Sequence, residues 1–216
     1  VLMGVIRYLG AFVFILIGYY SLTTTGIGTY SLVFFSFGVI PLLELIIPPY
    51  ASPNEPKSIK AYTMVLYAIL PFYFGLLLYF LITIGHDTTI LTILGKITAM
   101  GMLHGIFGIN MAHELGHRKS KLDQFLAQLL LWSSQYTHFF IEHNRGHHKR
   151  VATPEDPATA RKGENIYRFW NRSVRESFLS AWKLENDAQI RKNKAIFRWN
   201  NDMVKYLVYQ TALIAV

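Results

Sequence analysis

Five of the eight histidines stand in two short groups whose spacing suits a metal site. In "HELGH", His113 and His117 are four residues apart, so on a helix they share one face. In "EHNRGHH", His143 and His147 repeat that spacing, and His148 points about 100° further round the helix. Imidazole nitrogens bind zinc, iron and copper, and the chain has no cysteine to offer a softer ligand. We therefore predict that all five histidines are metal ligands.

The number of clustered histidines bears on which metal they hold. The letters "HELGH" match the HExxH signature of zinc proteases, in which Glu114 would be the general base. A catalytic zinc, however, takes three protein ligands and keeps one position open. Five histidines exceed that number and favour a dinuclear site, with an intramembrane zinc metalloprotease as the alternative. A metal carrier or transporter would instead need ligands along a path through the bilayer, whereas these gather at one edge of it.

Four polar residues beside the two groups are candidates for orienting the imidazoles by hydrogen bonds. Glu114 and Glu142 each precede a predicted ligand, and Asn110 lies one turn before the first group. His138, five residues before the second group, has either this role or a purely structural one. His104 lies inside an apolar run, where we expect packing or a hydrogen bond rather than metal binding.

Hydrophobic residues make up 52% of the chain and gather in long runs. A helix needs ~20 apolar residues to cross a bilayer. Four runs reach this length, so we predict an all-α, polytopic transmembrane helical bundle, with a four-helix transmembrane region over residues 1–112. The runs are residues 4–22, 30–48, 62–84 and 88–112.

The basic residues predict which side of the membrane the histidines face. The connections 23–29 and 85–87 carry no Lys or Arg, whereas 49–61 carries Lys57 and Lys60. The formal net charge is +8, with many basic residues after the first histidine group. By the positive-inside rule, the 49–61 loop and both histidine groups lie in the cytoplasm. No groove-reading or base-stacking motif accompanies the basic residues, so we expect no nucleic-acid partner.

Residues 113–202 are predicted to form a cytoplasmic-facing histidine-box region. The apolar run 122–141 is long enough to span, but one crossing would part the two histidine groups, so we expect an interfacial helix that does not cross. A basic amphipathic helix should follow. Residues 203–216 predict the start of a truncated further membrane helix, so we expect the chain to be an N-terminal fragment. The apolar side of the amphipathic helix would comprise Phe169, Trp170, Val174, Phe178, Leu179 and Trp182.

Three stretches resemble the membrane-bound alkane monooxygenases of bacteria, which are histidine-box diiron enzymes akin to fatty acid desaturases and hydroxylases. They are "HELGHR", "FFIEHNRGHH" and "ATPEDPATAR", and the likeness extends over most of the chain. The resemblance implies that His113 and His117 form the first box and that His143, His147 and His148 form the second. The family has further ligands in "EHYG"-like and "HSDHH"-like motifs, which would lie in a missing C-terminal part.

The resemblance also implies a function. Such enzymes hold two non-haem irons and insert one oxygen atom of O2 into the terminal methyl of a medium- or long-chain n-alkane, giving a primary alcohol. Electrons come from rubredoxin and its reductase. The expected location is the bacterial inner membrane, with the site on the cytoplasmic side, and a related histidine-box desaturase or hydroxylase is an alternative. Basic residues that would attract an acidic donor, or simply follow the positive-inside rule, are Arg118, Lys119, Lys121, Lys149 and Arg150.

Overall fold

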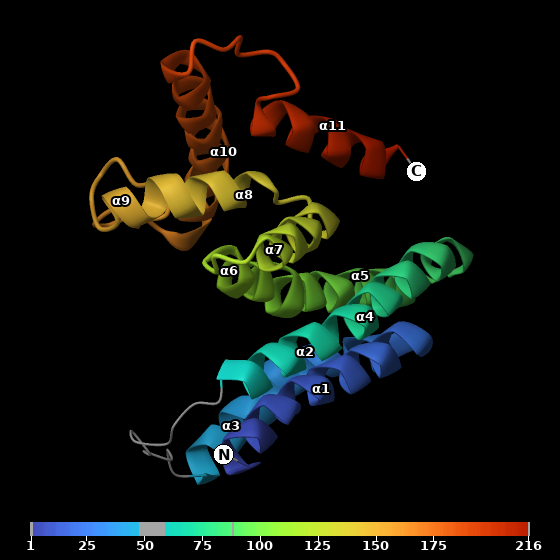
Figure 1. The fold of residues 1–216 in the computed structure, drawn as a ribbon. Helices are drawn as coiled ribbons and strands as arrows, with labels where there is room; N and C mark the ends of the chain where they lie inside the picture. Colours follow the sequence, from blue (N-terminus) through green and yellow to red (C-terminus); the bar gives the residue numbers. More distant parts are fainter. Residues whose placement is uncertain (1, 48–58, 88, 216) are drawn as a thin grey trace. The chain divides into compact units, whose positions relative to one another are not determined.

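The computed structural model describes residues 2–47, 59–87 and 89–215, and every regular element in these residues is helical. The predicted all-α class is therefore confirmed. Of the predicted cytoplasmic loop 49–61, Lys57 and most other residues lie outside the described ones. The chain divides into two compact units, which we call unit 1 (Val1–Phe107) and unit 2 (Gly108–Val216) and describe separately (Figure 1).

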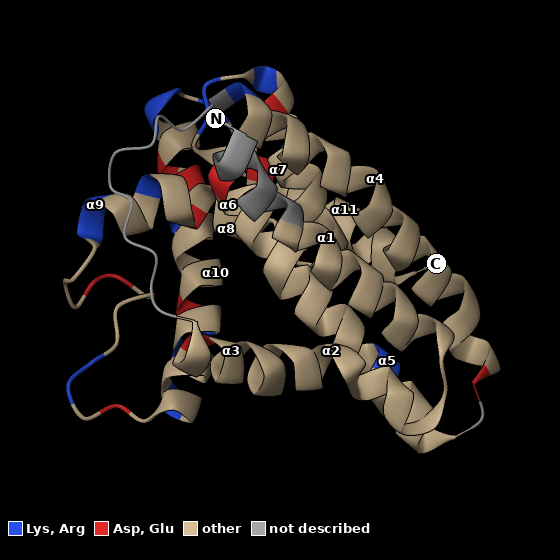
Figure 2. Ribbon diagram, turned by 90° about the horizontal axis from the view of Figure 1, so that it is seen from below, with Lys and Arg blue, Asp and Glu red and all other residues tan. Residues whose placement is uncertain are grey.

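Unit 1 contains the long apolar helices. Its elements are α1 (Leu2–Thr23), η1 (Gly26–Tyr30), α2 (Ser31–Phe34), η2 (Phe35–Val39), α3 (Ile40–Ile46), α4 (Ile59–Thr83), η3 (Ile84–His86), α5 (Ile90–Leu103) and the start of the π-helix η4 (His104–Ile109). Several of these join end to end. Among the described residues, three continuous helices are long and apolar enough to cross a membrane: Gly26–Ile46, Lys60–His86 and Ile90–Gly116. They carry few charged residues (Figure 2).

The first predicted span, residues 4–22, falls within α1. This helix has 22 residues, and the part of it whose side chains are described, Gly10–Thr23, is apolar. The other three predicted spans coincide with the three long helices, so the structure supports a polytopic membrane protein. The division of the chain into a transmembrane region and a cytoplasmic region stays a prediction.

Two polar contacts inside unit 1 join groups on the apolar helices. The Lys96 ammonium lies 2.8 Å from Oδ2 of Asp87, and the two side chains are only 7% and 13% exposed. His104 Nδ1 lies 2.6 Å from the hydroxyl of Tyr73, which is fully buried. Unpaired polar groups among apolar helices are costly, and these two contacts reduce the cost for the groups that they join. The expectation that His104 packs or hydrogen-bonds is confirmed.

Close packing of α5 against η1 yields a first prediction. A Cβ at Gly95 would overlap the Thr29 side chain and lie 2.8 Å from a ring carbon of Tyr30. Gly95→Ala should therefore destabilise unit 1 by about 1–3 kcal/mol, because the neighbours must move. Gly101, on the same helix, has nothing within 4 Å of its would-be Cβ. Gly101→Ala should be neutral or mildly stabilising, and thermal unfolding in detergent would compare the two; equal melting temperatures would contradict the prediction.

Unit 2 carries both histidine groups on short helices. After the end of η4 come α6 (Asn110–Gly116), α7 (Lys121–Ser133), α8 (His138–Ile141), the π-helix η5 (Glu142–His147), α9 (His148–Arg150), α10 (Ile166–Arg191) and α11 (Asp202–Ile214). The segment from α8 to α9 is continuous, α7 contacts α6, and α10 contacts α8 and η5.

The predicted single helix over 122–141 is wrong. It is two helices, because α7 ends at Ser133 and α8 begins at His138. Between them Gln135 takes a left-handed backbone conformation with φ of 56°, and the amide of Tyr136 bonds back to the carbonyl of Leu131 at 2.8 Å. With 13 residues, α7 extends only about 20 Å, which is less than the apolar thickness of a bilayer. The expectation that this helix does not cross is thus compatible with its length.

The predicted apolar side of the amphipathic helix is also only partly right. Trp170, Val174 and Leu179 are more than half exposed on α10. The face that is buried consists of small or hydrogen-bonding residues, namely Ser177, Ala181, Glu185 and Gln189. Small side chains let α10 approach η5 closely, and a polar face suits the charged residues that η5 presents.

Candidate metal centre

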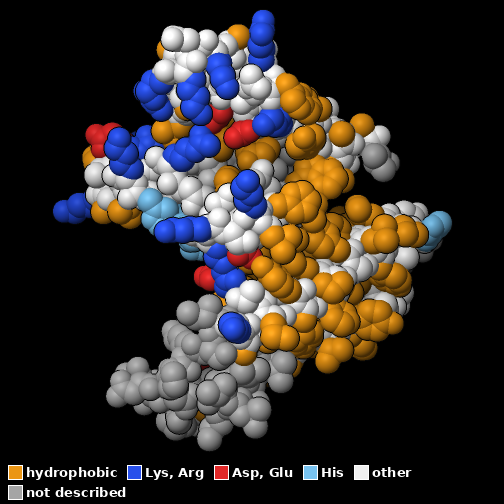
Figure 3. All heavy atoms as spheres, in the orientation of Figure 1, with side chains coloured by type: hydrophobic (Ala, Val, Ile, Leu, Met, Phe, Trp, Pro, Cys, Tyr) orange, Lys and Arg blue, Asp and Glu red, His pale blue; other side chains and the backbone are white. Residues whose placement is uncertain are grey.

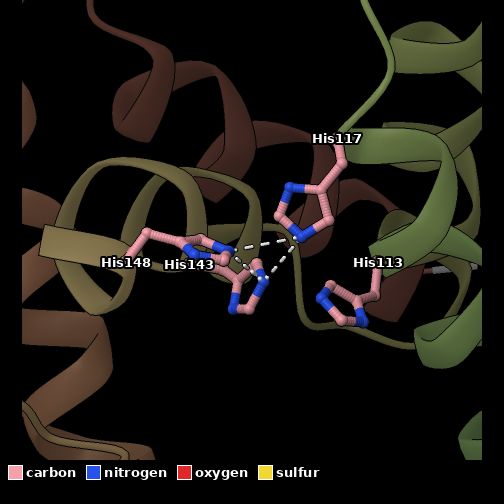
Figure 4. Close-up of side chains that lie close together, drawn as sticks. All are labelled: His113, His117, His143 and His148. Atoms are coloured by element: carbon pink, nitrogen blue, oxygen red, sulfur yellow. Dashed lines mark hydrogen bonds between the residues drawn. The ribbon is translucent and has the colours of Figure 1, made fainter. Parts of the chain in front are cut away.

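Four imidazoles from the two predicted groups converge in unit 2 (Figure 4). The Nε2 atom of His143 lies 3.0 Å from Nε2 of His117 and 3.0 Å from Nε2 of His148. His117 and His148 are 3.3 Å apart at the same atoms. The ring of His113 completes the group, with its centroid 4.4 Å from that of His143. One ligand atom from each of the four lies within 4.8 Å of the others, so the two histidine groups share one site.

These imidazoles fit a metal ion. Nitrogens bound about 2.0–2.1 Å from one metal lie roughly 2.9–3.4 Å from one another, which matches the distances among the three Nε2 atoms. Three nitrogens that all face one another cannot each satisfy the other two by hydrogen bonds, because each carries either one proton or one lone pair. A cation among them gives every lone pair a partner. The site therefore suits a metal that accepts several neutral imidazoles.

A π-helix brings His143 and His148 together. Five residues apart, they would point about 140° away from each other on a regular α-helix. In η5 the backbone is wound more loosely, and residues five apart come into register. The spacing in the sequence predicts that His143 and His147 share one face of the helix and that His148 points away from it. This prediction of the geometry is therefore wrong. His148 joins His143, and the sequence carries no plain signal for this change of winding.

His147 lies outside the group of four. Its ring stacks on that of His143, with centroids 5.3 Å apart and an angle of 19° between the planes. Its Nδ1 lies 2.9 Å from Oδ2 of Asp156. Asp156 was not among the predicted site residues, although it stands in the "ATPEDPATAR" stretch. A single buried acid in a Pro-rich loop gives no hint of its partner in the sequence alone.

The predicted orienting carboxylates have arginine partners among the described residues. Glu114 pairs with Arg118, 3.1 Å away and four residues on. Glu142 is buried and accepts a bond of 2.8 Å from Arg150, which also bonds Ser180. A Cβ at Gly146 would lie 2.5 Å from the Arg150 guanidinium and 2.5 Å from the Glu142 carboxylate, so this ion pair packs directly against the glycine. These acids brace the helices that carry the histidines; a direct bond from either to an imidazole stays a prediction.

The other two predicted orienting residues lie apart from the group of four. Asn110 is exposed on α6. His138 is 6% exposed, and its ring packs edge-on against Tyr136 and Phe178. Its Nε2 is buried and has no hydrogen-bond partner among the described residues. Packing is the role that these contacts support for His138.

The surroundings keep two of the clustered imidazoles neutral. Burial, together with the neighbouring His113 and His148, lowers the pKa of His117. Burial and then the adjacent histidines lower the pKa of His143 to about 3. A neutral imidazole offers the lone pair that a metal needs, so both residues are ready to bind at neutral pH.

The buried ring of His138 predicts a pH effect on stability. Burial lowers its pKa to about 4, whereas an unfolded histidine titrates near 6.5. Below that pH the unfolded chain binds more protons than the folded one, so stability is lost as the pH falls. The cost should reach about 2 kcal/mol at pH 5. Metal-free protein should thus lose more thermal stability between pH 7.5 and pH 5 than its His138→Phe variant. Equal losses in the two proteins would contradict this prediction. The control is His86→Phe, a substitution of the same kind at an exposed site.

Comparison with known proteins agrees with the geometry. The family model for fatty acid desaturase matches residues 88–216, which include both histidine groups. Alkane 1-monooxygenase of Pseudomonas putida is 33% identical over 184 residues, covering 82% of this chain and 46% of that protein. Alkane 1-monooxygenase 1 of Alcanivorax borkumensis is 34% identical over 209 residues, covering 93% of this chain and 52% of that protein.

A third relative has a different name. The hydroxylase component of a xylene/toluene monooxygenase of Pseudomonas putida is 29% identical over 184 residues, covering 82% of this chain and 49% of that protein. The chain thus spans about half the length of the curated relatives that it matches. The match to the family model extends over more than half of the chain, from before the first histidine group to the end, and so the chain belongs to the fatty acid desaturase family.

Proposed function

We propose that the protein is a non-haem diiron monooxygenase that hydroxylates the terminal methyl of medium- or long-chain n-alkanes. The observation that carries the proposal is the convergence of four imidazoles from two helices, in a chain similar to alkane 1-monooxygenases. The overall reaction consumes an alkane, O2, two electrons and two protons, and it yields a primary alcohol and water. Irons held by the histidines would supply the activation of O2.

Histidines of this chain would hold the metal. His113, His117, His143 and His148 are the ligands that the geometry supports. His147, from the second histidine box, would be a fifth ligand. All five offer imidazole nitrogens, which suit iron. The zinc-protease alternative uses only the two histidines of the first box and leaves the convergence with the second box without a purpose.

The membrane helices suit an apolar substrate. An alkane partitions into the bilayer, and it has no polar group to recognise, so shape must select the carbon that reacts. The three long helices expose many large apolar side chains, as a protein in lipid does (Figure 3). We place the protein in the bacterial inner membrane with its metal centre on the cytoplasmic side, following the positive-inside rule.

Electron delivery by rubredoxin belongs to the same proposal. Of the basic residues expected to attract an acidic donor, Arg118 and Arg150 are engaged in ion pairs with Glu114 and Glu142. Lys119, Lys121 and Lys149 are exposed, and these three remain to steer a donor protein.

A second substrate class has a specific observation in its favour. The relative named for xylene and toluene is similar to 82% of this chain, so an aromatic ring that carries a methyl group is the second candidate substrate. Both candidates share the oxidation of a terminal methyl C–H bond. They differ in the width of the space that the substrate needs.

The deciding experiment uses the full-length protein. Purified in detergent, it should contain about two irons per chain, as a dinuclear site requires, and no stoichiometric zinc. With rubredoxin, its reductase and O2, it should convert n-octane to 1-octanol, whereas toluene should give little product. One zinc per chain, or peptide cleavage without O2, would overturn the proposal in favour of the protease. Turnover of toluene alone would move it to the second substrate class.

A further inference from the structure

Asp156 is buried in the loop between α9 and α10, with 1% of its surface exposed. Each of its side-chain contacts is with a donor. Oδ1 accepts from the amide of Ala158 at 3.0 Å. Oδ2 accepts from the hydroxyl of Thr159 and also lies 2.9 Å from Nδ1 of His147. A carboxylate in these surroundings acts as an acceptor, so the proton of the contact with His147 belongs on the imidazole.

This contact decides which nitrogen of His147 carries the proton. With Nδ1–H donating to the carboxylate, the other nitrogen, Nε2, keeps its lone pair. His147 is also the one predicted ligand that lies outside the group of four, and its ring stacks on His143. The carboxylate reaches it from nine residues away in the sequence, through a loop that is otherwise exposed at Glu155 and Ala158.

We propose that Asp156 is a positioning residue for the metal centre: it holds His147 in the Nδ1–H form and so presents Nε2 as the metal-binding nitrogen. The inference rests on the proposed function, because it takes His147 to be a ligand. A carboxylate behind an imidazole also raises the basicity of the free nitrogen and fixes the plane of the ring. His147 would therefore bind as a separately braced ligand, apart from the four histidines that face one another.

A competing explanation is that Asp156 only shapes the loop. Its bonds to Ala158 and Thr159 make a local turn that needs no metal. Asp156→Asn separates the two roles. The amide oxygen still accepts from Ala158, and the Thr159 hydroxyl can rotate to accept from the amide nitrogen, so the turn is kept. The same amide nitrogen would donate to Nδ1 of His147, which moves the ring proton to Nε2 and blocks that lone pair.

The test measures ferrous iron binding to the metal-free full-length protein by competition with a chelator under anaerobic conditions. Asp156→Asn should weaken one part of the iron binding about 10- to 100-fold, while the melting temperature of the metal-free protein stays unchanged. Asp156→Glu, which keeps a carboxylate, should recover part of the affinity. Glu155→Gln, which removes the same charge from the exposed neighbouring residue, should bind iron like the unaltered protein.

A double variant ties the effect to the imidazole. If Asp156 acts through His147, Asp156→Asn should add nothing to the loss already caused by His147→Ala. Unaltered iron affinity in Asp156→Asn would overturn the inference. The inference would also be overturned if Asp156→Asn and Asp156→Ala lowered the melting temperature and the iron affinity equally. That result is expected if Asp156 only shapes the loop. Since the readout is iron binding, the inference stands or falls separately from alkane turnover.

Discussion

Replacing His143 with alanine is expected to abolish hydroxylation while the protein still inserts into the membrane. Its Nε2 atom faces both His117 and His148, and its ring also contacts His113, so it is the central member of the group. Loss of an outer partner of a metal ligand costs about 10- to 100-fold in metal affinity or activity, so loss of the central ligand should cost at least about a hundredfold. Iron content and octanol formation by the full-length protein would measure it.

The control for His143 is a histidine that lies far from the group in the sequence. His86 is exposed at the end of η3 in unit 1. His86→Ala should leave iron content and turnover unchanged. If His143→Ala retained both iron and turnover, His143 would not be a ligand, and the convergence of imidazoles would have to be explained by packing alone.

Replacing Arg150 with methionine is expected to destabilise unit 2 by about 2–4 kcal/mol. Arg150 bonds Glu142, whose side chain is 5% exposed, and removing the arginine leaves that carboxylate buried without its counter-charge. The loss falls below that of a fully buried pair because Arg150 is itself 28% exposed. Burial raises the pKa of Glu142 against the opposing effect of the hydrogen bonds with Ser180 and Arg150, so the acid can also take up a proton, which limits the loss of stability.

The neighbouring Lys149 is the matched control, since it is exposed and one residue away. Lys149→Met should change the melting temperature little, because exposed charges contribute little to stability. Glu142→Gln combined with Arg150→Met should recover part of the loss, because the double variant no longer buries an unpaired charge. If Arg150→Met and Lys149→Met melted at the same temperature, the pair would not stabilise the helix that carries the second box.

Local patterns in the sequence determine several features of this protein. The apolar runs around Gly26–Ile46, Lys60–His86 and Ile90–Gly116 predict long helices, and the structure confirms them. The two histidine motifs identify the four imidazoles that later prove to meet. Both results follow from short-range properties, namely the length of an apolar run and the type of side chain, which a sequence states directly.

Tertiary structure alone decided how those residues are combined. The π-helix η5 pairs His143 with His148, although the regular helical repeat predicts His147 as its partner. The winding of a helix responds to the packing of its neighbours, and the 3.6-residue repeat does not contain that information. In the same way, the break at Gln135 and the small, polar buried face of α10 depend on what lies opposite them in space.

The sequence by itself thus determined which side chains supply the chemistry and which segments are apolar enough for a membrane. Only the folded chain decided that His147 turns to Asp156 and that Arg150 pairs with Glu142. The physical reason is that side-chain identity and apolar length are properties of each segment alone. A hydrogen bond or an ion pair depends on two groups whose distance is set by the whole path of the backbone between them.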